Sequence, residues 1–430
     1  EINTLQTKKR DGFSINLNRE GNTLAAITSD GNSFGYIDEA GTFVPFYDYV
    51  DNVWYHIKLD VDFESGTYDI YLNNKRKVAG VRLKNEAGSM DEILVQAEQD
   101  PNQLIIDDIL LYRKRVYSDY VEAPVAPQKK DDTLLCMQMC PLWTEGTHYG
   151  WDPIKAASND REPLVGFYDE NNPEVYDWFI KWMVEHGVDF QFQCVYPTAR
   201  INYDIVANEP VKNDMVREFN GLTCGYMNAK YSDQMKFAII LECTTFFHGY
   251  KHNREFFDYY LPFYIEYYLK DDRYMKINGR PVIGVFSLSS FLDIFDDGTG
   301  EESIRRGIEK FRQVCIDSGV GDPYILSNDS TASNVIKMAA DAGLDGITAY
   351  GLGGTATFAT QRSNMQESVQ MCREEGIDLW PIATPMRDDI AWRVFSGYSH
   401  TGEEFAQHLS WMQTELMPSV PSSLGQKIIN

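Results

Sequence analysis

The chain has 430 residues and a formal net charge of −25, from 64 Asp and Glu against 39 Lys and Arg. Hydrophobic residues make up 43% and aromatic residues 13%, which excludes a disordered or fibrous chain. The negative charge argues against nucleic acid as a partner, because a phosphate backbone needs a basic surface. No apolar run reaches the ~20 residues that a membrane-spanning helix requires, so no transmembrane segment is expected.

Residues 1–122 consist of short alternating segments separated by turns. Apolar and polar residues alternate in Phe13–Leu17, Trp54–Val61 and Thr67–Leu72, and turn residues such as Asp30-Gly31 stand between such segments. Period-two alternation interrupted by polar turns is typical of an antiparallel β-sandwich. We therefore predict a sandwich over residues 1–122 and no helix within it.

Two neighbouring segments of this region resemble the jelly roll of concanavalin-like and laminin-G-like domains. In Val53–Asp62 a Trp-Tyr strand leads into an Asp-rich turn, and Thr67–Asn73 follows as the second strand of a hairpin. The resemblance implies a jelly roll over residues 1–122. The Pro-rich and charged residues 123–132 are then expected to form a linker.

From residue 133 onward, apolar strands alternate with helices. Buried parallel strands are expected at 134–142, 188–196, 235–243, 281–288, 323–328, 344–350 and 377–383. Glycines stand where the intervening helices end before the next strand, at Gly187, Gly319, Gly343 and Gly376. Repeated strand–helix units indicate a TIM-type (β/α)8 barrel over residues 133–430. In this fold the site lies at the carboxyl ends of the strands.

An eighth strand is expected to begin within Ser423–Asn430, where the sequence ends. A ring of seven strands would leave two unpaired edges, which folded proteins avoid. We therefore expect that the chain stops before the natural end of the fold, with the barrel cut off in its eighth strand.

Stretches of residues 133–430 resemble, in the same order, motifs of glycoside hydrolase family 99 and its WbsX-like relatives. They are Pro163–Val175 with Glu185–Phe190, then Asp272–Val282, Leu344–Tyr350 and Thr384–Arg393. The resemblance implies a barrel that hydrolyses glycans in a protein that is secreted, periplasmic or on the cell surface. In that family the two catalytic carboxylates lie on the last barrel strand, so they would fall beyond Asn430.

Carboxylates at strand ends are the candidates for chemistry, because most glycosidases use two carboxyl groups that flank the scissile bond. Glu242 closes the apolar run Phe237–Leu241, where a charge is unfavourable unless it faces the barrel mouth or is paired. The resemblance matches Asp388, after the seventh strand, to a family aspartate. We predict Glu242 and Asp388 as catalytic residues. A structural ion pair is the alternative for each.

Further residues at strand ends are predicted to bind the substrate, because aromatic rings stack on sugar rings and polar groups bond hydroxyls. They are Trp143, Trp151, Tyr196, His248, Asn328, Tyr350 and Arg393. As alternatives, Trp143, Trp151 and Tyr196 could belong to the core, and Tyr350 could be a rim residue that packs against a loop. Arg393 could form a loop ion pair with Asp388, Asn328 could form a turn, and His248 could be a solvated loop residue. We expect no metal and no cofactor.

Other functions stay open at this point. A degenerate barrel could bind carbohydrate without turnover, with the sandwich as the binding domain. A glycosyltransferase is disfavoured, because no loop Asp-x-Asp motif with basic phosphate contacts is evident. The seven Cys residues show no clear metal-type pairing, so they are expected to be buried free thiols.

Overall fold

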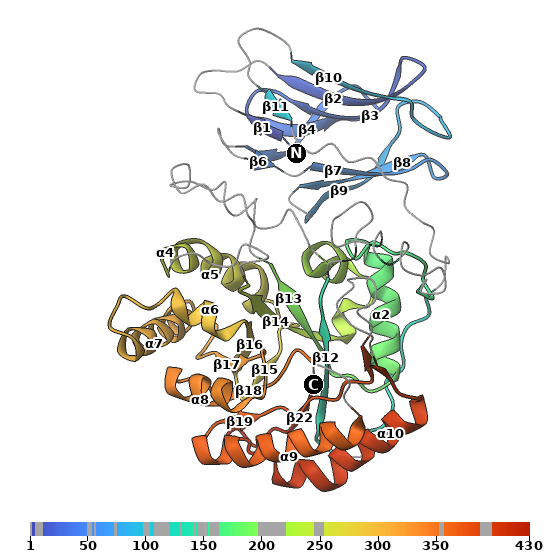
Figure 1. The fold of residues 1–430 in the computed structure, drawn as a ribbon. Helices are drawn as coiled ribbons and strands as arrows, with labels where there is room; N and C mark the ends of the chain where they lie inside the picture. The colour runs from blue at the N-terminus through green and yellow to red at the C-terminus, as the bar shows by residue number, and fades with distance from the viewer. Residues whose placement is uncertain are drawn as a thin grey trace. The chain divides into compact units, whose positions relative to one another are not determined.

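The computed structural model describes residues 2–4, 12–49, 54–55, 57–72, 75–97, 104–106, 121–129, 131–141, 143, 151, 154, 163–196, 221–244, 253–351, 357–387 and 398–430. The chain divides into two compact units (Figure 1). The first comprises Glu1–Lys114 and Arg200–Arg217, and the second Arg115–Ala199 and Glu218–Asn430. The predicted domain limits at 122 and 133 stay predictions.

Antiparallel sheets make up the first unit, as the alternating pattern predicts. One sheet has the order β10 (Glu92–Ala97), β2 (Phe13–Arg19), β3 (Asn22–Ser29), β4 (Ser33–Ile37) and β5 (Phe43–Asp48). The others are β7 (Ile57–Asp62), β8 (Thr67–Leu72) and β9 (Lys75–Arg82), and β11 (Leu104–Ile106), β1 (Ile2–Thr4) and β6 (Trp54–Tyr55). Ile27 and Ile70 pack together in a buried cluster that joins β3 to β8. The jelly-roll connectivity remains a prediction.

Parallel strands form the centre of the second unit. In chain order they are β12 (Leu134–Met139), β13 (Phe190–Val195), β14 (Lys236–Glu242), β16 (Arg280–Phe286), β17 (Tyr324–Ser327), β18 (Gly346–Ile347), β19 (Asp378–Leu379) and β22 (Ile428–Ile429). From β12 to β19 each strand pairs with the next in this series, and β22 pairs with β12. The short β15 (Lys276–Ile277) adds an antiparallel hairpin on β16. The strand order confirms the TIM-like part of the prediction.

A short strand lies where the eighth strand is expected to begin, and it pairs with the first strand of the series; that the barrel is cut off there stays a prediction. β22 pairs in parallel with β12 through Ile428 and Ile429. On its other side, the Asn430 N–H donates to the Pro381 carbonyl at 2.9 Å, and the Ala383 N–H donates to the Asn430 carbonyl at 2.8 Å. Backbone hydrogen bonds therefore join β22 and Asn430 to the segment that follows β19.

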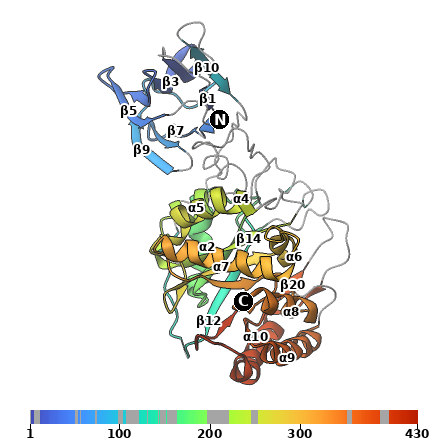
Figure 2. The ribbon, with the colours of Figure 1, turned by 90° about the vertical axis from the view of Figure 1, so that its left-hand side faces the viewer.

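Helices lie around the outside of the strands (Figures 1 and 2). They include α2 (Pro173–Glu185), α6 (Leu288–Asp293), α7 (Glu301–Asp317), α8 (Ser333–Ala342), α9 (Phe358–Glu375) and α10 (Gly402–Trp411). α2 begins at Asn172, whose side chain accepts the Glu174 N–H, and Pro173 takes the first helical position. α8 and α9 end at Gly343 and Gly376, both with positive φ, as the sequence predicts. No helix in the described part of the chain is long and apolar enough to cross a bilayer.

Two predicted helices are irregular. The helix expected over Arg254–Leu269 consists of α4 (Asn253–Glu255), α5 (Leu261–Tyr264) and the π-helical turns η5 (Phe256–Tyr260) and η6 (Ile265–Leu269). Within Asn213–Lys230, the described residues form a π turn, η1 (Gly221–Gly225), and a 3-10 turn, η2 (Tyr226–Asn228). At Gly225 a Cβ would lie 2.3 Å from the Glu170 carbonyl oxygen. Close packing therefore shapes this segment more than its helical pattern does.

Phe192 of β13 shows which side chains point into the ring. Its ring lies 6.0 Å from that of Trp380, which follows β19. β13 and β19 are not neighbours in the sheet, so this contact crosses the interior. Residues in register with Phe192, or two positions along a strand from it, therefore face inward as well.

Gly284 on β16 lies against the same ring, and we expect Gly284→Ala to destabilise the second unit. A Cβ there would lie 2.5 Å from Phe192 Cζ and 3.0 Å from Ile240 Cγ1. Overpacking of this kind costs about 1–3 kcal/mol, which urea unfolding would measure. Gly402→Ala is the control, because a Cβ there meets nothing within 4 Å. Equal stability of the two variants would contradict the packing argument.

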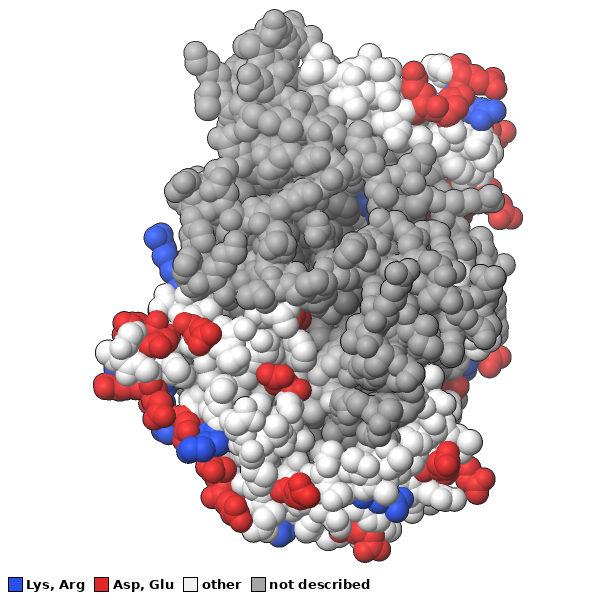
Figure 3. All heavy atoms as spheres, viewed as in Figure 1, with Lys and Arg blue, Asp and Glu red and all other residues white. Residues whose placement is uncertain are grey.

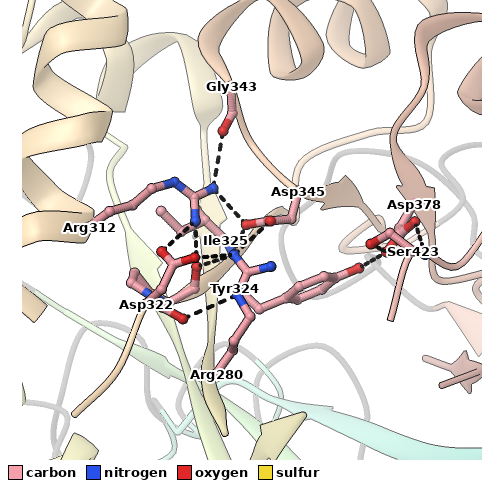
Figure 4. A network of polar contacts seen from close by, with 10 residues as sticks. Arg280, Arg312, Asp322, Tyr324, Ile325, Gly343, Asp345, Asp378 and Ser423 are labelled. Carbon is pink, nitrogen blue, oxygen red and sulfur yellow. Dashed lines mark hydrogen bonds and ion pairs between the residues drawn. The ribbon is translucent and has the colours of Figure 1, made fainter. Parts of the chain in front are cut away.

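An ion-pair network lies at the amino ends of the strands (Figure 4). Asp345, before β18, pairs at 2.7 Å with Arg280 of β16 and at 2.7 Å with Arg312 of α7. It also accepts the Ile325 N–H at 2.8 Å, and Arg312 bonds Asp322 at 3.0 Å. The network joins α7 to three strands at the end of the ring opposite the expected site.

Asp378 of β19 holds the segment that leads to β22 (Figure 4). Its carboxylate is buried, accepts the Tyr324 hydroxyl at 2.6 Å, and accepts the backbone N–H and hydroxyl of Ser423 at 2.6 and 2.8 Å. This short C-terminal strand is therefore fixed at its amino end by a side chain as well as by its backbone pairing.

His408 on α10 makes the stability of this unit dependent on pH. It is fully buried, with its ring stacked 4.4 Å from that of Phe358 on α9. Burial, with smaller contributions from Arg362 and His400, lowers the pKa of His408 from 6.5 to about 4. Because the folded pKa lies below the unfolded value, the stabilisation is complete above pH 6.5 and is lost as pH falls toward 4.

We expect the free energy of unfolding to fall by about 2 kcal/mol across this window because of His408 alone. His408→Phe keeps an aromatic ring there and removes the titrating group, so its stability should fall less between pH 7 and pH 4.5. Urea titrations at the two pH values measure the difference. His186→Gln, an exposed site, is the control that should keep the wild-type slope. An unchanged slope in His408→Phe would count against the assignment.

Candidate active site

Side chains from several strands meet at the carboxyl end of the ring. Cys140 follows β12, and its Sγ lies 3.2 Å from the hydroxyl oxygen of Tyr350. Tyr350 lies three residues after the end of β18. Gln138 Oε1 on β12 accepts from Asn328 Nδ2, just after β17, at 3.2 Å. β12 neighbours neither β17 nor β18, so both contacts cross the inside of the ring.

Glu242 is the last residue of β14, and its side chain points the same way as that of Ile240, which faces inward. It is 2% exposed. Oε1 accepts the Thr244 N–H at 3.1 Å, and Oε2 has no hydrogen-bond partner among the described residues. Burial raises the pKa of Glu242 from 4.5 to about 7, although hydrogen bonds from Thr244 oppose the shift. The carboxyl can therefore be protonated or ionised near neutral pH.

Asn328 and Gln138 form a polar pair deeper in the ring. Asn328 is fully buried, and its predicted role in substrate binding stays a prediction. One hydrogen bond joins the two side chains, from Asn328 Nδ2 to Gln138 Oε1. The other polar atoms, Asn328 Oδ1 and Gln138 Nε2, have no partner among the described residues. A free acceptor and a free donor in a buried position can be satisfied by water or by a ligand hydroxyl.

The two predicted tyrosines both reach the mouth. Tyr196 follows β13 and is 9% exposed. Burial, together with nearby Cys194 and Cys140, raises its pKa well above the ordinary value, so its hydroxyl stays protonated. Tyr350 is 47% exposed and packs its ring 5.0 Å from that of Phe286. Among the described residues, Tyr350 is thus an aromatic residue at the rim with ring surface open to a ligand.

The two predicted tryptophans stack on each other, with centroids 4.5 Å apart and planes at 23°. Trp151 is 4% exposed, and its indole N–H donates to the Tyr168 carbonyl at 2.6 Å. It offers almost no surface to a ligand and fits its core alternative. Trp143 is half-buried and keeps part of its surface available.

Glu170 is a buried carboxyl that the sequence did not single out. Its Oε2 accepts the Trp143 N–H at 2.8 Å, and its own N–H donates to the Trp143 carbonyl at 3.0 Å. Burial raises the pKa of Glu170 well above the ordinary value, against the opposing bond from Trp143. Glu170 lies shortly before Asn172, the N-cap of α2. The sequence around it has the pattern of a polar loop, which did not mark it as a site residue. Its contacts make it a positioning residue for Trp143.

Asp388, His248 and Arg393 lie outside the described residues, so their roles stay predictions. Within the described ranges, no group of three or more His, Cys, Asp or Glu side chains is arranged to hold a metal ion.

No family model matches the sequence. No curated protein matches it either.

Solved structures to which this chain is similar include the GH99 endo-alpha-mannosidase from Bacteroides thetaiotaomicron in complex with BIS-TRIS-Propane. It is 14% identical with a TM-score of 0.46, over 70% of this chain and 82% of that chain. Another structure of that enzyme is 13% identical with a TM-score of 0.44, over 69% of this chain and 84% of that chain. A glycoside hydrolase-like protein is 10% identical with a TM-score of 0.48, over 72% of this chain and 87% of that chain. The first two carry the family name that the sequence motifs resemble. At these values the likeness leaves the activity to be argued from this chain's own residues.

Proposed function

We propose that the second unit binds a glycan at the carboxyl end of its barrel and hydrolyses a glycosidic bond with Glu242 as a catalytic carboxyl. The observation that carries this proposal is the burial of the Glu242 carboxyl together with its raised pKa. Its carboxyl is buried at the mouth, has a pKa of about 7, and keeps one oxygen unpaired by any described residue. Buried carboxyls whose pKa is strongly shifted are frequent among catalytic groups.

A carboxyl with a pKa near 7 suits general acid catalysis, because it can hold a proton at neutral pH and transfer it to the leaving oxygen. Hydrolysis also needs a second, ionised carboxylate on the other side of the bond. Asp388 is our candidate, with Arg393 to orient it. His248 would contribute a polar contact to the sugar.

Substrate recognition would combine stacking with hydrogen bonds. Tyr350 and Trp143 supply ring surface, and the free groups of Asn328 and Gln138 can bond sugar hydroxyls. Carboxylates spread along the edge of the second unit that holds α7 (Figure 3), and the net charge is −25. A neutral glycan is therefore a better substrate than a polyanion. We propose a secreted, periplasmic or cell-surface location, where such glycans are found.

The proposal is tested by incubating the protein with a panel of neutral polysaccharides and measuring new reducing ends across pH. We expect turnover of at least one glycan, with a rate that falls as pH rises above 7 because Glu242 loses its proton. A rate that stays constant from pH 6 to pH 9 would remove Glu242 as the acid.

A second candidate is a carbohydrate-binding protein without turnover. One observation favours it: Glu170, a buried carboxyl, already accepts the Trp143 N–H, so it is not available as the second carboxylate beside Glu242. This candidate predicts glycan binding by calorimetry, with no new reducing ends over long incubation.

A further inference from the structure

Two thiols lie side by side at the barrel mouth. Cys140 Sγ is 3.5 Å from Cys194 Sγ. Cys194 is buried on β13, whereas Cys140, just after β12, is partly exposed. All seven cysteines of the chain are in the thiol form in this structure.

The backbone holds these two residues in a position compatible with a disulfide. Met139 of β12 and Gln193 of β13 are the last partners in the parallel register, and Cys140 and Cys194 are the next residue of each strand. Neighbouring strands lie roughly 4.8 Å apart, which falls within the Cα separation that disulfides use, about 4.4–6.8 Å. Small side-chain rotations would bring the two sulfur atoms together.

The surroundings activate one of the two thiols. Hydrogen bonding to Cys194, and more weakly to Tyr350 and Tyr196, lowers the pKa of Cys140 below its usual value despite burial. The same contact with Cys140, together with burial, raises the pKa of Cys194. Cys140 is thus both the more acidic and the more accessible thiol, as a nucleophile in thiol–disulfide exchange should be.

We propose that Cys140 and Cys194 form a redox-active dithiol that small-molecule disulfides convert reversibly to a disulfide at the barrel mouth. Cys140 loses its proton and attacks one sulfur of the oxidant, such as oxidised glutathione, which releases one thiolate. Cys194 then attacks Cys140 of the mixed disulfide, and the second thiolate leaves. Two protein thiols are oxidised and one external disulfide is reduced to two thiols.

The bond would change the mouth beside Glu242. Cys140 Sγ contacts both Cys194 and the rim residue Tyr350, so drawing it toward Cys194 alters the contact with Tyr350. This inference goes beyond the proposed function and does not depend on it, because its chemistry can be read from the thiols directly.

The test is to incubate the full chain with oxidised glutathione at pH 7.5, block remaining thiols with N-ethylmaleimide, and measure intact mass and peptides. We expect two fewer alkylated thiols, a single linked peptide that joins Cys140 to Cys194, and full reversal by dithiothreitol. Absence of this link at excess oxidant would overturn the proposal, and so would random links among the other cysteines in protein whose circular dichroism is native.

Variants separate the two roles. Cys194→Ser lacks the resolving thiol, so it should accumulate one glutathione on Cys140. Cys140→Ser should neither attach glutathione nor form an internal disulfide. Its remaining thiols should all be alkylated after denaturation. Cys372→Ser, a buried thiol on α9, is the control that should form the disulfide normally. Glutathione attached to Cys194 instead of Cys140 would contradict the assignment of the nucleophile.

Discussion

Glu242→Gln is expected to lower glycan hydrolysis at least about 100-fold, because the amide cannot deliver a proton to the leaving oxygen. The unfolding temperature should stay the same or rise, since the amide has the size of the carboxyl and avoids burying a group that ionises near neutral pH. Initial rates on the best polysaccharide of the panel, together with calorimetric unfolding, measure both effects.

The matched control is Glu170→Gln, a change of the same kind at another buried carboxyl. Glu170 accepts from the Trp143 backbone, so this variant should lose stability or glycan affinity while keeping the pH profile of the wild type. If Glu242→Gln retains full activity, Glu242 is not a catalytic residue. If both variants lose activity only in proportion to unfolding, Glu242 has a structural role.

Asp345→Ala is expected to lower the free energy of unfolding by about 3 kcal/mol, because it removes the partner of two partly buried guanidinium groups. Among the described residues, Asp322 would remain the only carboxylate that the structure pairs with Arg280 and Arg312, beside backbone carbonyls such as that of Pro323. The Ile325 N–H would lose its acceptor (Figure 4). Activity per folded molecule should not change, since the network lies at the amino ends of the strands. Urea unfolding gives the difference.

Asp341→Ala on α8 is the control for this change. Asp341 pairs with Lys337 one helical turn away in an exposed position, and such pairs contribute about 0.3–0.5 kcal/mol. A loss in Asp345→Ala no larger than in this control would show that the network adds little stability.

Much of the fold could be predicted because barrel strands and helices leave local signals. Fully buried parallel strands appear as continuous apolar runs, such as Phe237–Leu241, and helices that end before a strand need glycine at a left-handed position, as at Gly343. Glu242 stood out because a carboxyl at the end of such a run must face the mouth or be paired.

The sequence predicts that a strand begins within Ser423–Asn430, but not what this strand pairs with, because pairing depends on long-range contacts. β22 has only two residues, and Asn430 exchanges backbone hydrogen bonds with Pro381 and Ala383. A segment this short has no periodicity that could indicate its neighbours.

The site residues that were missed share this property. Glu170 stands in a polar loop, and its importance comes from Trp143, 27 residues earlier. Cys140 and Cys194 are 54 residues apart and meet only because β12 and β13 pair in register. Trp151 was predicted to bind sugar because aromatic rings stack on sugar rings. Only the structure shows that neighbouring aromatic rings cover it.

The most direct test of the central claim is a crystal structure of the protein with an oligosaccharide of the best-bound glycan. The account predicts a sugar at the barrel mouth, with an oxygen within hydrogen-bonding distance of Glu242 Oε2 and contacts to Tyr350 and Asn328. A sugar bound only to the antiparallel first unit, with the barrel mouth empty, would contradict it.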